Sequence, residues 1–240
     1  CHFTGYYEPE LEGRRAPDAR FCHPLHGLPP GFRQDRPWFS RQEITTQNLL
    51  AGRELIWLDS AVEAFLAQVQ GSVRVRVEGG ALLRFGFAGK NGHGYRSIGK
   101  ELIRRGAIAA DAISADAIRD WCAANPDEVA GLLAVNPSYV FFRLLELAAE
   151  DGPIGSSGVP LTALRSLAAD PDHVPTGSPV WVECGSVQAL FVAQDTGSAI
   201  RGDSRADLFC GSGRVAGRMA SGLNTQGTMH VFRLRAGVKP

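Results

Sequence analysis

The sequence predicts a mainly β fold of the α+β class, in which a mixed middle segment precedes a C-terminal segment resembling a small β-barrel. Over Asp59–Gln70, apolar residues recur with the i, i+3, i+4, i+7 spacing of an amphipathic helix, and Gly71 ends the pattern. Ser72–Val77 then alternates Val with Arg, as a half-exposed strand does. After Leu144, short apolar runs are separated by Gly, Ser and Asp turns, which is typical of a small antiparallel or mixed barrel.

Three more helices are expected in the middle segment. Tyr95–Arg105 has an apolar face, and Ser114–Ala124 begins with its own serine as N-cap. Asn125 is the expected N-cap of the next helix, which has Pro126 at its first position and runs to Leu133. The helices are thereby confined to the middle of the chain.

The remaining elements are short strands. Gly79-Gly80 forms a predicted hairpin turn between Ser72–Val77 and a return strand over Ala81–Ala88. The other expected strands are Tyr139–Arg143, Val180–Cys184, Ala189–Gln194 and Met229–Leu234. The first forty or so residues are rich in Pro and Gly and indicate extended strand and loop.

Composition places the chain among ordinary globular proteins. Its 240 residues are 44% hydrophobic and 21% charged, which excludes intrinsic disorder and collagen. The 25 basic and 25 acidic residues cancel, which argues against a nucleic-acid protein held by bulk charge. The 28 glycines and 14 prolines indicate many turns.

The cysteines and the chain start carry little targeting information. The five cysteines, at positions 1, 22, 122, 184 and 210, include no C-x-x-C pair, which disfavours a zinc site. We expect buried thiols with at most one disulfide, and a Cys184–Cys210 pair stays open. No apolar run reaches the roughly 18 residues of a transmembrane helix. Because the first residues already resemble folded protein, we expect a preceding segment outside this chain.

The densest polar segment is Gln194–Gly211, which holds three aspartates on one strand–loop–strand unit. Apolar neighbours flank Asp207, and desolvation by them would raise the pKa of its carboxyl group. A carboxyl that keeps its proton near neutral pH can act as a general acid on a glycosidic bond. The residues alone favour another interpretation, in which Asp195, Asp203 and Asp207 bond the backbone of turns.

This segment resembles the three-aspartate (3D) signature of the membrane-bound lytic murein transglycosylase A family, and four other segments agree with that family in chain order. The five segments are Phe3–Pro9 (FTGYYEP), Val69–Ser72 (VQGS), Ala88–Lys100 (AGKNGHGYRSIGK), Asn136–Arg143 (NPSYVFFR) and Gln194–Gly211. Motifs in register over nearly the whole chain are more specific than one short pattern. Asp203 is the weakest match, because the loop between Asp195 and Asp207 varies within the family pattern.

The resemblance implies two domains with a groove for a glycan strand between them. Residues 1–12 and 144–240 would form a catalytic double-psi β-barrel domain. Residues 13–143 would form an inserted, smaller β-barrel domain with helices. The 240 residues therefore indicate a barrel interrupted by a second domain.

The implied activity is that of a lytic transglycosylase, a peptidoglycan lyase. It would cleave the β-1,4 bond between N-acetylmuramic acid and N-acetylglucosamine without water, as the muramic C6 hydroxyl attacks C1 and leaves a 1,6-anhydro end. Asp207 matches the family's catalytic aspartate and would act first as acid and then as base. Asp195 would be the supporting carboxylate, and no metal or cofactor is required.

Substrate-binding residues are expected in the same motifs. Aromatic rings with polar tips, such as Tyr6 and Tyr7, can stack on sugars, although strand tyrosines are as often half-core. Arg201 and Arg205 would contact stem-peptide carboxyl groups or balance the aspartates. The full expected set is Thr4, Gly5, Tyr6, Tyr7, Gln70, Ser72, Lys90, Asn91, Tyr95, Gly197 and Gly211.

Two other functions stay open at this point. An inverting glycoside hydrolase would use Asp207 as acid and Asp195 as base on water. A non-catalytic module would bind glycan strands without cleaving them. The resemblance favours a periplasmic enzyme acting on peptidoglycan and attached to the outer membrane through an N-terminal lipoprotein segment, with no nucleic-acid partner.

Overall fold

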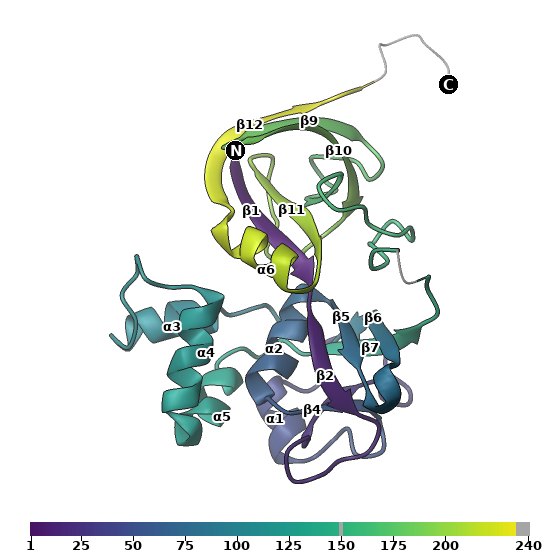
Figure 1. Cartoon of the computed structure of the whole chain (residues 1–240), viewed down its shortest axis with the longest axis vertical. Coiled ribbons are helices and arrows are strands. Elements are labelled where there is room, and N and C mark those ends of the chain that lie inside the picture. The colour runs from purple at the N-terminus through teal and green to yellow at the C-terminus, as the bar shows by residue number, and fades with distance from the viewer. Residues whose placement is uncertain (149–150, 234–240) are drawn as a thin grey trace. The chain divides into compact units, whose positions relative to one another are not determined.

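The computed structural model describes residues 1–148 and 151–233, and the chain divides into two compact units (Figure 1). The first unit comprises Cys1–Glu8 and Leu147–Pro240, and the second comprises Pro9–Glu146. The second unit therefore interrupts the first, whose N-terminal strand folds with the C-terminal part of the chain. The domain bounds that the sequence predicts, 1–12 with 144–240 and 13–143, stay a prediction.

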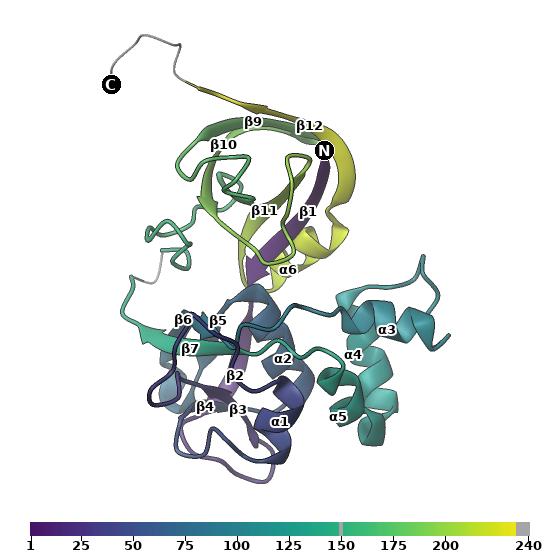
Figure 2. The same ribbon diagram turned by 180° about the vertical axis from the view of Figure 1, so that it is seen from behind.

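The first unit is a closed six-stranded barrel, as the predicted fold class requires. Its strands are β1 (His2–Glu8), β8 (Ser166–Ala169), β9 (Pro179–Cys184), β10 (Val187–Asp195), β11 (Arg205–Ser212) and β12 (Asn224–Val231), in the order β1-β11-β8-β10-β9-β12. β1 runs parallel to β11, and β8 runs parallel to β10. Figure 2 shows the same barrel from behind. Inward-pointing apolar side chains fill it, among them Phe3, Leu167 and Phe191.

Helix α6 (Gly213–Gly222) packs against β1 and β11 (Figure 1). The contact is close because glycines stand where the backbones meet. A Cβ on Gly5 would lie 2.7 Å from Cα of Ala220, and one on Gly217 would lie 2.9 Å from the Tyr7 ring. We did not predict this helix from the sequence, although Val215, Ala216, Met219 and Ala220 recur with helical spacing; its buried side chains are the small ones of Ala216 and Ala220.

The second unit is built on a six-stranded sheet of order β3-β4-β2-β5-β6-β7. Its strands are β2 (Glu10–Arg14), β3 (His23–His26), β4 (Glu54–Leu58), β5 (Ser72–Arg76), β6 (Leu82–Lys90) and β7 (Val140–Leu145). Its helices are α1 (Arg41–Thr46), α2 (Ala61–Gln70), α3 (Ile98–Arg104), α4 (Ala115–Ala124) and α5 (Pro126–Ala134). The ring of His26, in β3, lies 2.8 Å from the hydroxyl of Tyr139, the residue before β7. A hydrogen bond thus links the two edge strands of the sheet.

Most predicted elements of the second unit are confirmed, with shifts at their ends. Ser60 caps α2, and Gly71 ends it at φ 80°, as expected of Gly71. The predicted helix at Tyr95 begins only at Ile98, because the Ser97 side chain caps it. Asn125 is the N-cap residue of α5 and Pro126 begins the helix, as expected; the Asn125 side chain makes no capping hydrogen bond and its amide donates to the Trp121 carbonyl at 2.8 Å.

In the barrel, the predicted strands at 180–184 and 189–194 are confirmed within β9 and β10. The last strand spans Asn224–Val231 rather than Met229–Leu234, and Leu234 lies outside the described residues. All five cysteines are free thiols, so Cys184 and Cys210 are unpaired.

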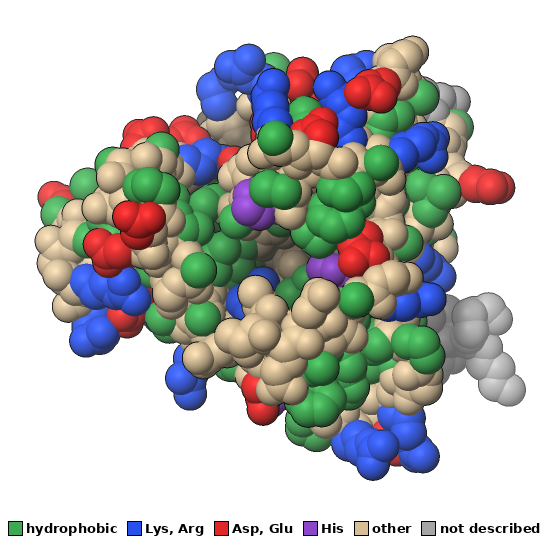
Figure 3. Space-filling model, turned by 90° about the horizontal axis from the view of Figure 1, so that it is seen from below, with side chains coloured by type: hydrophobic (Ala, Val, Ile, Leu, Met, Phe, Trp, Pro, Cys, Tyr) green, Lys and Arg blue, Asp and Glu red, His purple; other side chains and the backbone are tan. Residues whose placement is uncertain are grey.

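Across residues 1–148 and 151–233, no helix combines the length and apolarity needed to cross a bilayer. The described part of the chain also holds no group of three His, Cys, Asp or Glu side chains placed to bind a metal ion. Basic and acidic side chains are interspersed on the face shown in Figure 3, in keeping with the zero net charge.

Candidate active site

The outer face of the barrel at β1 and β11 carries the polar residues of two motifs. The two strands pair in parallel, with His2 opposite Arg205, Thr4 opposite Asp207 and Tyr6 opposite Phe209. Their alternate residues, such as Phe3 and Ala206, are buried in the barrel core. Because side chains alternate along a strand, Thr4 and Asp207 point away from that core on the same face.

A β-bulge brings Asp195 to this face. Ala193 of β10 pairs with Leu167 of β8, and both belong to the core. The register then shifts, so that Asp195 pairs with Ala168. In a regular strand with no bulge Asp195 would share the core face of Ala193, since side chains two apart point the same way. Ala168 also pairs with Asp207, so it lies between the two aspartates in one row.

Asp207 is half-buried and accepts a short hydrogen bond. The Thr4 hydroxyl donates to its Oδ1 at 2.6 Å, and Nη2 of Arg205 donates to the Thr4 hydroxyl oxygen at 2.6 Å. Burial raises the pKa of Asp207, while the Thr4 bond and the Arg205 charge lower it and the nearby Asp195 raises it. Burial prevails, so this carboxyl holds its proton more tightly than an exposed aspartate.

Asp195 is held through both of its oxygens. The Tyr6 hydroxyl donates to Oδ2 at 2.9 Å, and the backbone N–H of Ser156 donates to Oδ1 at 3.0 Å. Burial raises the pKa of Asp195, against the hydrogen bonds that favour its charged form. Burial, followed by the charge of Asp195, also raises the pKa of Tyr6 well above its ordinary value, so Tyr6 stays a donor.

The third predicted aspartate does not join this pair. Asp203 is exposed and accepts a bond from the Ser204 hydroxyl at 2.9 Å. Asp170, which the sequence did not single out, is buried and accepts from the Gly202 N–H at 2.8 Å. It also pairs with Arg201 at 3.4 Å. Asp170 thus holds the loop between Asp195 and Asp207, and the charge of Arg201 balances that of Asp170.

Several predicted substrate contacts in the barrel also have a role in its packing or backbone conformation. Gly5 packs against α6, where a Cβ would meet Cα of Ala220, and its contact with substrate stays a prediction. Tyr7 is half-buried with its ring on Gly217. Gly211 has φ 108°, which favours glycine, and a Cβ on Gly197 would meet Ile200 at 2.8 Å.

The other predicted substrate residues belong to the second unit. Gln70 ends α2, and Lys90 ends β6; both are half-buried, while Tyr95 is exposed. Ser72, the first residue of β5, is buried. The prediction that Asn91 contacts substrate is contradicted, because its side chain is 0% exposed. Its amide bonds the backbone of Phe39, Pro137 and Tyr139, each at 2.8 Å, and so leaves no surface for a ligand.

Asn91 and a buried arginine together fix the segment before β7. Arg41 donates to the carbonyl oxygens of Asn136 and Ser138 at 3.1 and 2.7 Å, and to Gln68 Oε1 at 2.6 Å. Its guanidinium lies 4.9 Å from the Tyr139 ring centroid, and burial lowers its pKa to about 10. No periodicity or motif signalled Arg41, since its burial arises from contacts distant in sequence.

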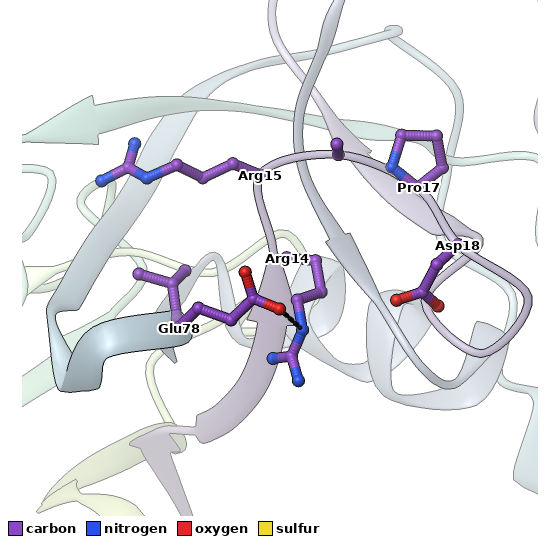
Figure 4. A pocket seen from close by; sticks show the side chains of 7 residues that line it. Arg14, Arg15, Pro17, Asp18 and Glu78 are labelled. Carbon is purple, nitrogen blue, oxygen red and sulfur yellow. Dashed lines mark ion pairs between the residues drawn. The ribbon is translucent and has the colours of Figure 1, made fainter.

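The second unit also has a small pocket, lined in part by Arg14, Arg15, Asp18 and Glu78 (Figure 4). Arg14 is paired with Glu78 at 2.7 Å. None of the residues that line this pocket belongs to the predicted site.

Two family models match the chain. The MltA specific insert domain matches residues 2–143, and the 3D domain matches residues 165–233. The chain belongs to the membrane-bound lytic murein transglycosylase A family.

Sequence and structural relatives agree with this membership. A relative in Escherichia coli K12, membrane-bound lytic murein transglycosylase A, is 36% identical over 98% of this chain and 66% of its own length. A crystal structure of a membrane-bound lytic murein transglycosylase from Agrobacterium tumefaciens is 34% identical with a TM-score of 0.88, covering 96% of this chain and 73% of that one. E. coli MltA with bound chitohexaose is 35% identical with a TM-score of 0.86, covering 95% and 71%. The chain thus spans about two thirds of the length of such curated relatives.

Proposed function

We propose that this chain is a lytic transglycosylase that cleaves the β-1,4 bond between N-acetylmuramic acid and N-acetylglucosamine in peptidoglycan. The single observation that carries the proposal is the pair of half-buried carboxyls, Asp207 and Asp195, on one barrel face beside Thr4 and Tyr6. Membership of the family supports the substrate class, as does the structure of E. coli MltA with bound chitohexaose.

Asp207 acts alone as acid and base in the proposed reaction. Its proton passes to the leaving oxygen as the C1–O bond breaks, and the substrate's N-acetyl group stabilises the cationic C1. The ionised Asp207 then takes the proton of the C6 hydroxyl while the C6 oxygen bonds to C1. The product carries a 1,6-anhydro end, and Asp207 is protonated again.

Asp195 supports this site rather than acting on a water molecule. Both of its oxygens accept hydrogen bonds from the protein, from Tyr6 and from Ser156. A carboxylate held in this way orients its neighbours and adds negative charge close to the developing cation at C1.

Mass spectrometry of the muropeptides released from purified sacculi tests the proposal. We expect 1,6-anhydromuramic ends with the wild-type chain and no release with Asp207→Asn. Reducing muramic ends would instead identify a hydrolase, the alternative in which Asp207 and Asp195 act on a water molecule. Equal binding of sacculi by both proteins, with no release by either, would identify a glycan-binding module.

We also propose that the enzyme works in the periplasm next to the outer membrane. The family name, with its reference to a membrane, supports an envelope location. Peptidoglycan glycan strands are then its partners. Cell fractionation with an antibody to the chain checks this, and recovery in the cytosol would contradict it.

A further inference from the structure

Arg205 directs its hydrogen bonds into the protein, next to the proposed acid. Nη2 donates to the Thr4 hydroxyl, and Nη1 donates to the carbonyl oxygens of Ala206 and His2 at 2.9 and 3.2 Å. These three bonds to β1 and β11 fix the guanidinium of Arg205. Arg205 pairs across the strands with His2, next to the pair of Thr4 and Asp207 on the same face. These bonds use three of the five N–H donors of the guanidinium.

With Asp207 ionised, the chain of bonds from Arg205 to Asp207 has a fixed direction. A guanidinium has donors and no acceptor, so the Thr4 oxygen must accept from Arg205. Thr4 then uses its one proton toward Oδ1 of Asp207, 2.6 Å away. Because Oδ1 is an acceptor in this arrangement, the acidic proton of Asp207 belongs on Oδ2.

We propose that Arg205 is a positioning residue that acts through Thr4, holding the Thr4 hydroxyl as a donor to Oδ1 so that Oδ2 of Asp207 carries the transferred proton. The inference rests on the proposed function, because it requires Asp207 to be the acid. Oδ2 gives its proton to the leaving oxygen as the C1–O bond breaks. It regains a proton from the C6 hydroxyl as the new C1–O bond forms, so no other reactant is needed.

The charge around Asp207 makes this role measurable. Its titratable neighbours are His2 and Tyr6 on β1, Arg205 and Cys210 on β11, and Asp195 on β10. The Arg205 charge and the Thr4 bond both lower the pKa of Asp207. Removal of either would raise that pKa and move the basic limb of the pH–activity profile to higher pH.

A double-mutant cycle on the 240-residue chain tests the inference. We expect kcat to fall about 10- to 100-fold in Arg205→Gln and in Thr4→Val, with KM nearly unchanged, because a hydrogen bond to a charged group is lost. Thr4→Ser keeps the hydroxyl and should retain most of the activity. The double variant should be no slower than Thr4→Val alone, since Arg205 acts through Thr4.

Melting curves check that each variant folds, and a change at a matched exposed arginine is the control for the cycle. Arg218 is exposed on α6 in the same unit, and Arg218→Gln should leave kcat and the pH profile unchanged. If Arg205→Gln does not fold, Arg205→Lys replaces it, because lysine keeps the charge but lacks the forked donors. The same loss of kcat and the same non-additivity with Thr4→Val are then expected.

The failures of the two proposals can be told apart. If the wild-type chain forms no anhydro ends, the proposed function and this inference both fall. If it forms them and Asp207→Asn is inactive, additive effects of the Arg205 and Thr4 changes overturn the inference alone. A wild-type kcat and an unshifted basic limb in Arg205→Gln would do the same.

Discussion

Burial raises the pKa of Asp207, while the Thr4 hydroxyl and Arg205 act in the opposite direction. The sequence indicated the first effect, because Ala206 and Leu208 flank this aspartate. It could not indicate the second, since Thr4 is 203 residues away and meets Asp207 only in the folded barrel. At the scale of one residue, the sequence therefore predicts that Asp207 is desolvated, but not which of its two oxygen atoms carries the proton.

Asp207→Asn should abolish muropeptide release while leaving the melting temperature at neutral pH equal or higher. The folded-state pKa is raised above the unfolded value, so the folded state binds the proton more tightly. The charged carboxyl therefore lowers stability above the folded pKa, and this loss declines as the pH falls through the folded pKa and is gone below the unfolded pKa. Melts of both proteins over a pH series measure the difference. Asp203→Asn, at an exposed site, is the control, and a large fall in the melting temperature of Asp207→Asn would contradict the argument.

The pH profile of activity follows from the same group. The reaction begins with protonated Asp207, so activity should be highest at mildly acidic pH and decline as the pH rises past the raised pKa. Rates of anhydro-end formation at several pH values measure this decline. A rate that stays constant into the alkaline range would exclude Asp207 as the acid.

Among the elements, two local features decide how the site is assembled. The bulge in β10 turns Asp195 from the core face to the face of Ala168 and Asp207. Helix α6 packs so closely on β1 that Gly5 has no room for a side chain. The sequence shows the residues of both features, yet register and helix packing depend on partner strands that it does not specify.

Gly5→Ala should destabilise the chain by about 1–3 kcal/mol, because its Cβ would overlap Cα of Ala220 at 2.7 Å and Sγ of Cys210 at 3.0 Å. Gly222 also lies in the first unit, and a Cβ there meets nothing within 4 Å. Gly222→Ala should therefore change the free energy of unfolding by less than about 0.5 kcal/mol. Denaturant unfolding of both variants provides the comparison, and equal effects would show that α6 does not constrain Gly5.

Over the whole molecule, the barrel is made from both ends of the chain. β1 pairs with β11 and β12, and the second unit, Pro9–Glu146, is one continuous segment between them. β1 also carries Thr4 and Tyr6, so the N-terminal strand both closes the barrel and completes the proposed site.

Deletion of residues 1–8 should abolish activity and remove the unfolding transition of the barrel, because β11 and β12 would each lose a partner. The second unit keeps its own sheet and cores, so a cooperative transition from Pro9–Glu146 should persist. Calorimetry and limited proteolysis can separate the two units. Loss of all cooperative unfolding would show that the second unit depends on the first.

The sequence by itself determined the fold class, most elements of the second unit and the family, because periodicity, caps and motifs are local signals. It also placed Asp195 and Asp207 on one segment and marked Asp207 as desolvated. Only the tertiary structure decided that Thr4, Tyr6 and Arg205 surround these carboxyls, that Asp203 stands aside and that Asn91 is structural. The physical reason is that strand pairing joins residues about two hundred positions apart, and a one-residue bulge decides which face a side chain takes.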